Sequence, residues 1–388
     1  MGVLIHNKKK ELVIKAVNTI IEVLYLPYKV FSRKPDLLKL SPKKILLIRL
    51  DHIGDVVMTS PAFRLVRDTF PKAELILLTD QVGKHLYAKD PGLNKVIAFS
   101  WPWVHQKSNN RFTKSKLIDL YRLISTLRKE EIDTVIDFRG DLRFVILFGV
   151  LIGAKVRVSN SRCGKSSLLD AASTYDVSKH EVERAIDVVS CFGTINKDRN
   201  PGVFLEPGEA DLIRDKVAQI TAARFPGRVA VIAPYSSKDV KSWPVENFRS
   251  VISHLSNKGY SVFIAGTPDD EENARAMIQG LEGSVYSLAG KTSIRELAAL
   301  LSMSQLVLGV DTGVLHIASC FNVPIIAIFG STRSIEFRPY SETAMVLETH
   351  SCRCNQFLHD KCDFSVNGYA KCLTEVNPEM VINAIDNL

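Results

Sequence analysis

The chain has 388 residues, of which 46% are apolar and 24% are charged. This length is typical of two domains of about 150 residues or more, and this composition excludes global disorder. The formal net charge is +8, but residues 1–50 hold 11 Lys and Arg against 3 Asp and Glu, whereas residues 51–388 hold 39 of each. A neutral folded body lacks the basic face of nucleic-acid-binding domains, so we expect no nucleic-acid partner.

The basic excess belongs to a leader, residues 1–42. Between Glu11 and Phe31 most polar residues follow one another at steps of three or four, which is typical of a narrow polar stripe on a helix. Basic residues flank this segment on both sides, and Pro27 interrupts it, so it does not resemble a spanning helix or a cleaved signal. We expect residues 8–34 to contact a membrane surface as an in-plane amphipathic helix. Packing on the body or on a partner chain is the alternative.

Seven cysteines are present, and four of them cluster near the C-terminus: Cys352, Cys354, Cys362 and Cys372. Without an export signal we expect a reducing, cytoplasmic compartment and no disulfides. Four thiolates within about 20 residues can hold zinc, but a single residue between Cys352 and Cys354 fits the usual spacing poorly. A structural metal is therefore the less favoured interpretation of this cluster.

The body alternates strand and helix patterns, which favours doubly wound parallel sheets with helices on both faces. We expect one domain over residues 43–200 and a second over residues 201–388. In the first, the expected strands are 44–49, 75–78, 96–99 and 134–137, the expected helices are 56–70, 117–128 and 181–192, and residues 160–179 are expected to form a loop. In the second, the expected strands are 229–233, 261–265, 285–287, 306–310 and 324–329, and the expected helices are 246–258, 294–303 and 314–321, with another opening at 266–270.

One loop of the first half, residues 51–55, follows a predicted strand, where open parallel sheets bind ligands. In the loop from Asp51 to Asp55, Gly54 permits a tight turn. Asp55 is placed either to cap the following helix or to act as a general base. The local sequence leaves both interpretations of Asp55 open.

The second half has three such loops. Residues 234–244 carry hydroxyls such as that of Ser237, and lysines, of which Lys241 is the better phosphate ligand because Trp243-Pro244 stiffens the chain after it. Solvated surface lysines are the alternative. In residues 266–272 several acids open a helix, either to bind ribose hydroxyls or to complement the helix dipole.

The third loop, Asp311-Thr312-Gly313, joins a buried strand to a helix. Free backbone amides at such a turn bind phosphate, and Gly313 lets a ligand approach the backbone closely. His316, on the first helical turn, either donates to a leaving phosphate or packs.

Four segments together resemble glycosyltransferase family 9, the bacterial heptosyltransferase family. They are ILLIRLDHIGDVVMTSPAFRLVRDTFPKAEL (45–75), VIDFRGDLRF (135–144), KSWPVENF (241–248) and LGVDTGVLHIASCFNVPIIAIFGST (308–332). The resemblance covers residues 43–388 and implies a GT-B fold, in which two Rossmann-like domains face each other across a cleft. It also implies an inverting, metal-independent transfer of a sugar, typically from ADP-heptose, to a lipopolysaccharide core acceptor. The enzyme is then expected at the inner face of the bacterial inner membrane.

The same resemblance assigns roles to residues. Asp55 is implied as the catalytic base, and Lys241 as the ligand of the donor diphosphate. The groups implied to frame the diphosphate and sugar are Asp311, Thr312, Gly313 and His316. The donor-ribose acid is implied among Asp269, Asp270 and Glu271. The loop from Asp137 to Asp141 is implied to face the acceptor, together with Gly54, and Arg139 is a candidate for the acidic groups of that acceptor.

Other interpretations use the same frame. Another nucleotide sugar or another glycan acceptor is the main alternative. A non-catalytic nucleotide-sugar-binding protein is less favoured because Asp55 is present. A dehydrogenase is set aside, because the first turn reads DHIGDV and lacks the G-x-G-x-x-G pattern.

Overall fold

The computed structural model describes residues 19, 35–100, 113–162, 164, 168–195, 198–349, 362 and 364–388. The chain divides into two compact units, residues 1–199 and 200–388. The predicted membrane helix of residues 8–34 lies outside the described residues, apart from Thr19. Within the described part, no helix is both long and apolar enough to cross a membrane.

Unit 1 is built on a six-stranded sheet in the order β3-β2-β1-β4-β5-β6, and all of its strand pairs are parallel. The strands are β1 (Lys44–Ile48), β2 (Glu74–Thr79), β3 (Lys95–Ala98), β4 (Thr134–Asp137), β5 (Val156–Asn160) and β6 (Ala171–Ser173). The helices are α2 (Ile53–Thr69), α3 (Gln81–Tyr87), α4 (Lys114–Lys129), α5 (Leu142–Val145), which continues into a π-helical turn (Ile146–Val150), and α6 (Glu181–Ser190); a 3₁₀ turn (Leu37–Lys39) precedes β1.

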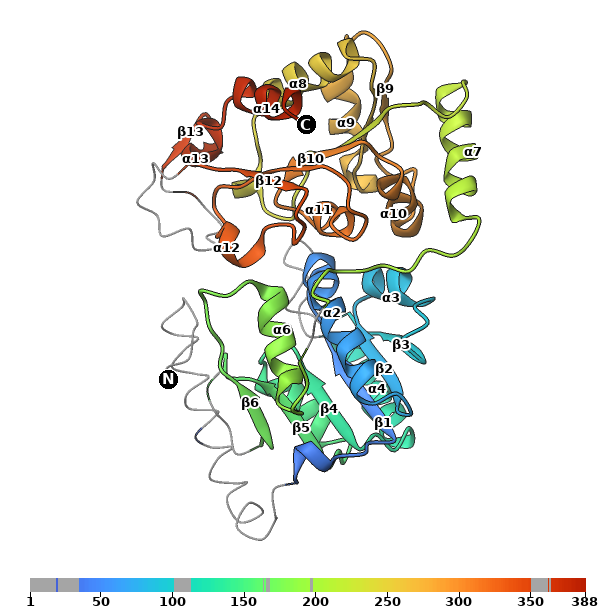
Figure 1. Ribbon diagram of the computed structural model, residues 1–388, viewed down its shortest axis with the longest axis vertical. Helices are drawn as coiled ribbons and strands as arrows, with labels where there is room; N and C mark the ends of the chain where they lie inside the picture. Colours follow the sequence, from blue (N-terminus) through green and yellow to red (C-terminus); the bar gives the residue numbers. More distant parts are fainter. Residues whose placement is uncertain are drawn as a thin grey trace. The chain divides into compact units, whose positions relative to one another are not determined.

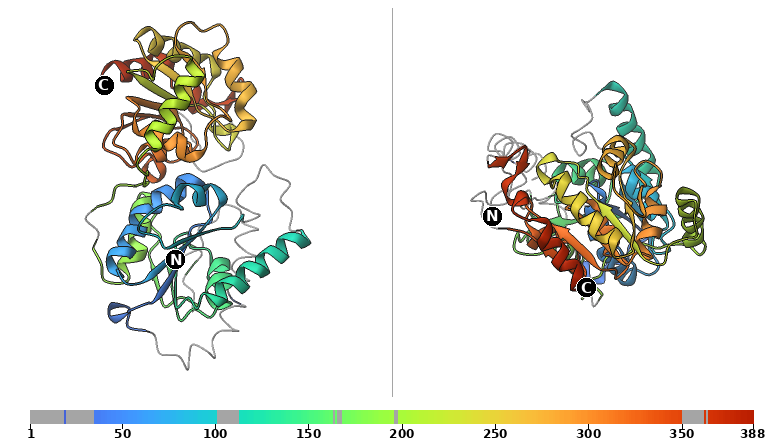
Figure 2. Two further views of the ribbon diagram at one scale, coloured as in Figure 1. Left: turned by 90° about the vertical axis from the view of Figure 1, so that its right-hand side faces the viewer. Right: turned by 90° about the horizontal axis from the view of Figure 1, so that it is seen from above.

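Helices cover both faces of the unit 1 sheet. Helices α2 and α6 lie side by side on one face (Figure 1). Helix α4 packs Leu123 and Leu127 against Leu46 and Ile48 of β1, on the other face (Figure 2). Strands covered on both faces read as continuous apolar runs, and this is why the sequence of β1 showed no alternation.

Unit 2 repeats the arrangement with the strand order β12-β11-β10-β7-β8-β9, again with parallel neighbours. The strands are β7 (Val229–Ala233), β8 (Ser261–Ile264), β9 (Val285–Ser287), β10 (Leu306–Val310), β11 (Ile325–Ile328) and β12 (Ala344–Leu347). The helices are α7 (Glu209–Thr221), α8 (Val245–Asn257), α9 (Glu271–Ile278), α10 (Ile294–Ser302), α11 (Gly313–Ala318), α12 (Ser334–Phe337), α13 (Lys371–Thr374) and α14 (Pro378–Asp386); short elements are the 3₁₀ turns Asp239–Lys241 and Pro268–Asp270 and the hairpin β13 (Ser365–Val366) with β14 (Tyr369–Ala370).

Both sheets have the same topology. In each, the first strand lies between the second and the fourth, so the direction of winding reverses between β1 and β4 and between β7 and β10. At such a reversal the loops leave in opposite directions and open a crevice at the carboxyl ends of the two strands. The sequence predicts functional residues in the loops after β1, β4, β7 and β10, and also in the loop after β8.

The doubly wound prediction is confirmed, and the predicted strands are present with ends shifted by at most two residues. The prediction of a loop over residues 160–179 is wrong, because β5 ends at Asn160 and β6 forms at Ala171–Ser173. A strand of three residues is too short to show a period. The helix expected from Val56 begins at Ile53 instead, so Gly54 is helical and makes no tight turn.

Candidate functional site

A buried arginine organises the candidate site of unit 1. Arg49 follows β1 and is 3% exposed. Its Nη1 donates to the Phe138 carbonyl at 2.9 Å, and its Nη2 donates to Glu181 Oε1 at 2.7 Å. The same guanidinium lies 3.1 Å from Asp51 Oδ2 and 3.5 Å from Asp55 Oδ1. Three carboxylates therefore share one cation at the switch point of the sheet.

Asp55 does not cap its helix, contrary to one interpretation of the sequence. The N-cap of α2 is His52, and Asp55 is the third helical residue, whose own N–H donates to the His52 carbonyl. Burial raises the pKa of Asp55, and the charge of Asp51 adds to this more than Arg49 opposes it. The side chain is still 23% exposed. A partly exposed carboxylate with a raised pKa is suited to accept a proton.

The sequence analysis missed two residues of this cluster, Arg49 and Glu181. Glu181 is the first residue of α6. One of its carboxylate oxygens accepts a hydrogen bond from Arg49, and the other accepts one from Arg184 Nη2 at 2.6 Å. Burial opposes ionisation of Glu181, but Arg49 and Arg184 outweigh it and lower its pKa to about 2. In the sequence Glu181 looked like an ordinary acid in a first helical turn, and nothing local linked it to Arg49.

Hydrogen bonds to the Asp137 side chain hold the loop after β4 in place. Its buried carboxylate accepts from the backbone N–H groups of Gly140 and Asp141, both at 2.9 Å, and from Ser159 Oγ at 2.8 Å. Arg139 bonds Asp51 and the Leu50 carbonyl, so the loops after β1 and β4 are joined. The sequence grouped Arg139 and Asp141 with the acceptor, and the structure places both beside the Arg49 cluster.

The titration of Asp137 gives a pH-dependent stability. Burial raises the pKa of Asp137 to about 6, although the Ser159 hydrogen bond opposes it. An unfolded aspartate has a pKa of about 3.9. Protonated Asp137 therefore stabilises the folded state fully below that pH, and this contribution to the unfolding free energy is lost as pH rises through the folded-state pKa. We expect the unfolding free energy of the wild type to fall by about 2–3 kcal/mol relative to Asp137→Asn between about pH 4 and pH 7. Urea unfolding across this range measures the difference.

Asp141→Asn is the matched control for Asp137→Asn. Burial opposes ionisation of Asp141, but its hydrogen bonds and charge contact with Arg143 outweigh burial and lower its pKa. The unfolding free energy of the wild type relative to Asp141→Asn should therefore fall as pH falls, whereas relative to Asp137→Asn it falls as pH rises. If the unfolding free energy of the wild type relative to Asp137→Asn did not change with pH, this would contradict a raised pKa of Asp137 in the folded protein.

In unit 2, an ion pair joins the loops after β7 and β10. Lys241 Nζ lies 2.6 Å from Asp311 Oδ2, and the two side chains are only 15% and 9% exposed. Ser236 Oγ, on the same loop as Lys241, donates to the Asp311 carbonyl at 3.2 Å. The alternative of a solvated surface lysine is therefore wrong for Lys241. An ammonium has three donors, so the pair with Asp311 leaves others for a ligand.

His316 is held as a neutral ring. It is 4% exposed, and its Nε2 lies 4.0 Å from Asp311 Oδ1. Burial lowers the pKa of His316 to about 4, the positive charge of Lys241 acts in the same direction, and the negative charge of Asp311 opposes both. Among the described residues, His316 Nδ1 has no hydrogen-bond partner, and neither do the buried hydroxyls of Tyr235 and Ser331, in the loops after β7 and β11. Buried polar groups left unsatisfied are expensive, which points to a polar ligand here.

Thr312 and Gly313 stand at the start of α11, with Thr312 as the N-cap in extended conformation. Its side chain makes no capping bond, so the first amides of this turn are not covered by it. Ser237 is exposed on the loop that carries Lys241. The structure thus brings Lys241, Asp311 and His316 together, with the α11 turn next to them.

The three acids after β8 have different surroundings. Asp270 closes a capping box by accepting from the N–H and hydroxyl of Thr267 at 2.8 and 2.7 Å. Glu271 is paired with Arg275. Asp269, which precedes both, is exposed. A Cβ on Gly266 would lie 3.0 Å from Asp270 Cβ and 3.2 Å from Tyr235 Cδ2, so Asp270 lies near the Tyr235 ring.

The cysteine cluster is only partly described. Cys352 and Cys354 lie outside the described residues. Cys372 is 3% exposed and packs in the apolar core of unit 2, and Cys362 packs against that core. Among the residues that the structure describes, no three His, Cys, Asp or Glu side chains gather in a way that would hold a metal.

Comparison with known proteins identifies the family. The model of glycosyltransferase family 9 (heptosyltransferase) matches residues 120–366, more than half of the chain. The chain belongs to glycosyltransferase family 9. It is similar to lipopolysaccharide heptosyltransferase 3 of Escherichia coli, with 26% identity over 295 residues, which cover 74% of this chain and 84% of that protein.

Solved structures of glycosyltransferases share the fold. A family 9 enzyme of Veillonella parvula DSM 2008 superposes with a TM-score of 0.74 at 20% identity, covering 90% of this chain and 97% of that one. The ADP-heptose lipopolysaccharide heptosyltransferase II of Escherichia coli gives 0.71 at 19% identity, covering 89% and 98%. Together with the two parallel sheets, these likenesses confirm the GT-B fold. As a family 9 member, the protein is a glycosyltransferase.

Proposed function

We propose that this glycosyltransferase moves a heptose from ADP-heptose to the core of a lipopolysaccharide acceptor. Its relatives are named as lipopolysaccharide heptosyltransferases, and one similar structure is named for ADP-heptose. The observation that carries the proposal is the buried Lys241–Asp311 pair beside the neutral His316, at the switch point of the unit 2 sheet.

Unit 2 binds the donor in this proposal. Lys241 and the amides of Thr312 and Gly313 face the diphosphate, and His316 lies next to the sugar. Asp269 receives the ribose hydroxyls, since Asp270 is committed to its capping box and Glu271 to Arg275. As the glycosidic bond breaks, negative charge builds on the leaving diphosphate. Preorganised positive groups oppose that charge without having to reorganise.

Unit 1 activates the acceptor. Asp55 takes the proton of the attacking hydroxyl while the oxygen attacks the anomeric carbon from the face opposite the diphosphate, which inverts the configuration. Arg139 and Asp141, in the loop after β4, contact the acceptor, as does Gly54, which precedes Asp55 in α2. Arg49 stays paired with Glu181 throughout and fixes the base.

Lys241 and the α11 amides supply the charge that a divalent cation supplies in other transferases, so the reaction proceeds without a metal. Isothermal titration with ADP-heptose, GDP-mannose and UDP-glucose, each with and without EDTA, tests donor choice. We expect binding of ADP-heptose at least about tenfold tighter than the others, which is about 1.4 kcal/mol, and unaffected by EDTA. Preference for another nucleotide would support a different sugar transfer, and loss of binding in EDTA would contradict metal independence.

A further inference from the structure

The segment that carries Lys241 is anchored on both sides of that residue. Val240 and Trp243 are 7% and 1% exposed, and both belong to the apolar core of unit 2. Lys241 lies between them in the turn Asp239–Lys241 and reaches Asp311 instead of the core. The position of the Lys241 ammonium therefore depends on how Val240 and Trp243 pack in the core.

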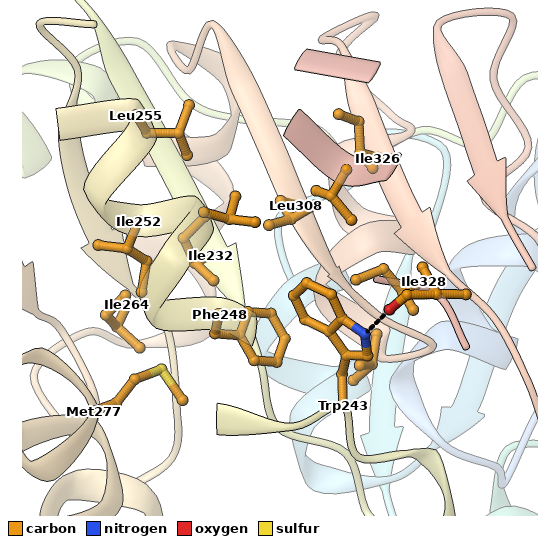
Figure 3. Packing of buried hydrophobic residues seen from close by; sticks show 14 of the residues in the cluster. Ile232, Trp243, Phe248, Ile252, Leu255, Ile264, Met277, Leu308, Ile326 and Ile328 are labelled. Atoms are coloured by element: carbon orange, nitrogen blue, oxygen red, sulfur yellow. Dashed lines mark hydrogen bonds between the residues drawn. The ribbon is translucent and has the colours of Figure 1, made fainter. Parts of the chain in front are cut away.

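Trp243 has a polar anchor as well as an apolar one. Its indole N–H donates to the Val376 carbonyl at 2.7 Å, and its ring meets Phe248 edge-on with centroids 4.8 Å apart. Figure 3 shows the indole between Phe248 and Ile328 with this bond drawn. The bond spans 133 positions in sequence and ties the lysine loop to the C-terminal segment between α13 and α14. A buried indole N–H needs such a partner.

The same C-terminal segment also supports a second loop of the site. A Cβ on Gly330 would lie 2.7 Å from Leu373 Cγ and 2.9 Å from Cys372 Sγ, so the chain after β11 rests directly on α13. Thr349 Oγ1 donates to the Cys372 carbonyl at 2.9 Å. Residues 370–376 thus form a support under the loops that carry Lys241 and Ser331.

We propose that Trp243 is a positioning residue. Its contacts with residues 370–376 fix the backbone that carries Lys241, and this sets the affinity for the donor diphosphate. This rests on the proposed role of Lys241 in donor binding. A lysine side chain loses much rotamer freedom on binding, and a fixed backbone and the Asp311 contact limit how much remains to be lost. Trp243 itself needs no contact with the ligand.

A double-mutant cycle on ADP affinity tests the proposal in the full chain. Trp243→Phe keeps an aromatic ring but removes the N–H donor, and we expect it to weaken ADP binding about tenfold. Lys241→Met should weaken binding by more. In the Lys241→Met background, Trp243→Phe should change the ADP dissociation constant less than twofold, because the residue through which it acts is gone.

Phe263→Leu is the control for general destabilisation. Phe263 is fully buried in β8, outside the cluster of Trp243, so this variant should lower the unfolding temperature and leave ADP affinity within twofold. If Trp243→Phe fails to fold, Val240→Ala tests the other anchor with the same cycle.

Three outcomes would overturn the proposal. An equal loss from Trp243→Phe in both backgrounds means that Trp243 acts independently of Lys241. Unchanged affinity in Trp243→Phe, with a clear loss in Lys241→Met, removes the positioning role alone. Unchanged affinity in Lys241→Met removes Lys241 from donor binding and the positioning role with it.

Discussion

Replacing Asp55 with asparagine should abolish most turnover while leaving the donor bound. The asparagine amide keeps the shape of the side chain but cannot take a proton, and loss of a general base costs about 10²- to 10⁴-fold in kcat. The dissociation constant for ADP should be unchanged, because the proposed donor groups all lie in unit 2. The variant should fold, since Arg49 keeps its contacts with Asp51 and Glu181. Steady-state kinetics and titration calorimetry measure the two quantities.

Asp51→Asn is the matched control for Asp55→Asn, because it removes a neighbouring carboxylate but keeps the base. The pH profile adds a second readout. Activity should fall on the acid side as Asp55 is protonated, at a pH above the ordinary range of an aspartate because burial and Asp51 raise its pKa. In Asp51→Asn this limb should move to lower pH, since a like charge has been removed. An Asp55→Asn enzyme with most of its activity would exclude Asp55 as the base.

Replacing Lys241 with methionine should affect donor binding, chemistry and stability together. The diphosphate loses its cation, and we expect kcat/KM to fall about 10²- to 10³-fold, as for removal of one preorganised donor. Asp311 is left buried without its partner, which costs about 3 kcal/mol in unfolding free energy. His316 should become easier to protonate, because Lys241 contributes to lowering its pKa. Histidine ring signals followed by NMR against pH measure that shift.

Adding Asp311→Asn to Lys241→Met distinguishes the stability effect from the catalytic one. The double variant no longer buries an unpaired carboxylate, so it should regain part of the lost stability without regaining activity. Recovery of activity in the double variant, or an unchanged ADP affinity in Lys241→Met, would contradict a direct role of Lys241 at the diphosphate.

Much of this architecture was predictable because it is encoded locally. Each inner strand is a short apolar run followed at once by a polar loop, so strands, their order along the chain and the loops at their carboxyl ends could all be inferred. The Lys241 and Asp311 loops follow β7 and β10, and parallel strands bring their carboxyl ends to one edge. The ion pair between them, 70 positions apart in sequence, follows from that geometry.

Other features depend on contacts that a sequence does not display. Glu181 meets Arg49 across 132 positions, and its neighbours on α6 gave no sign of this. Gly54 looked like a turn residue, yet α2 begins before it and makes it helical. Trp243 looked like a local stiffener, but its partner is the Val376 carbonyl near the C-terminus. In each case tertiary packing, and not local propensity, decides the role.

Acceptor-dependent release of ADP from ADP-heptose, measured with the full-length protein in EDTA, tests the central claim most directly. The account predicts release that requires a lipopolysaccharide core acceptor lacking the transferred heptose, that persists in EDTA, and that falls at least about 100-fold in Asp55→Asn. Release that is equally fast without acceptor, or that Asp55→Asn leaves intact, would contradict a transfer in which Asp55 activates the acceptor and Lys241 stabilises the leaving diphosphate.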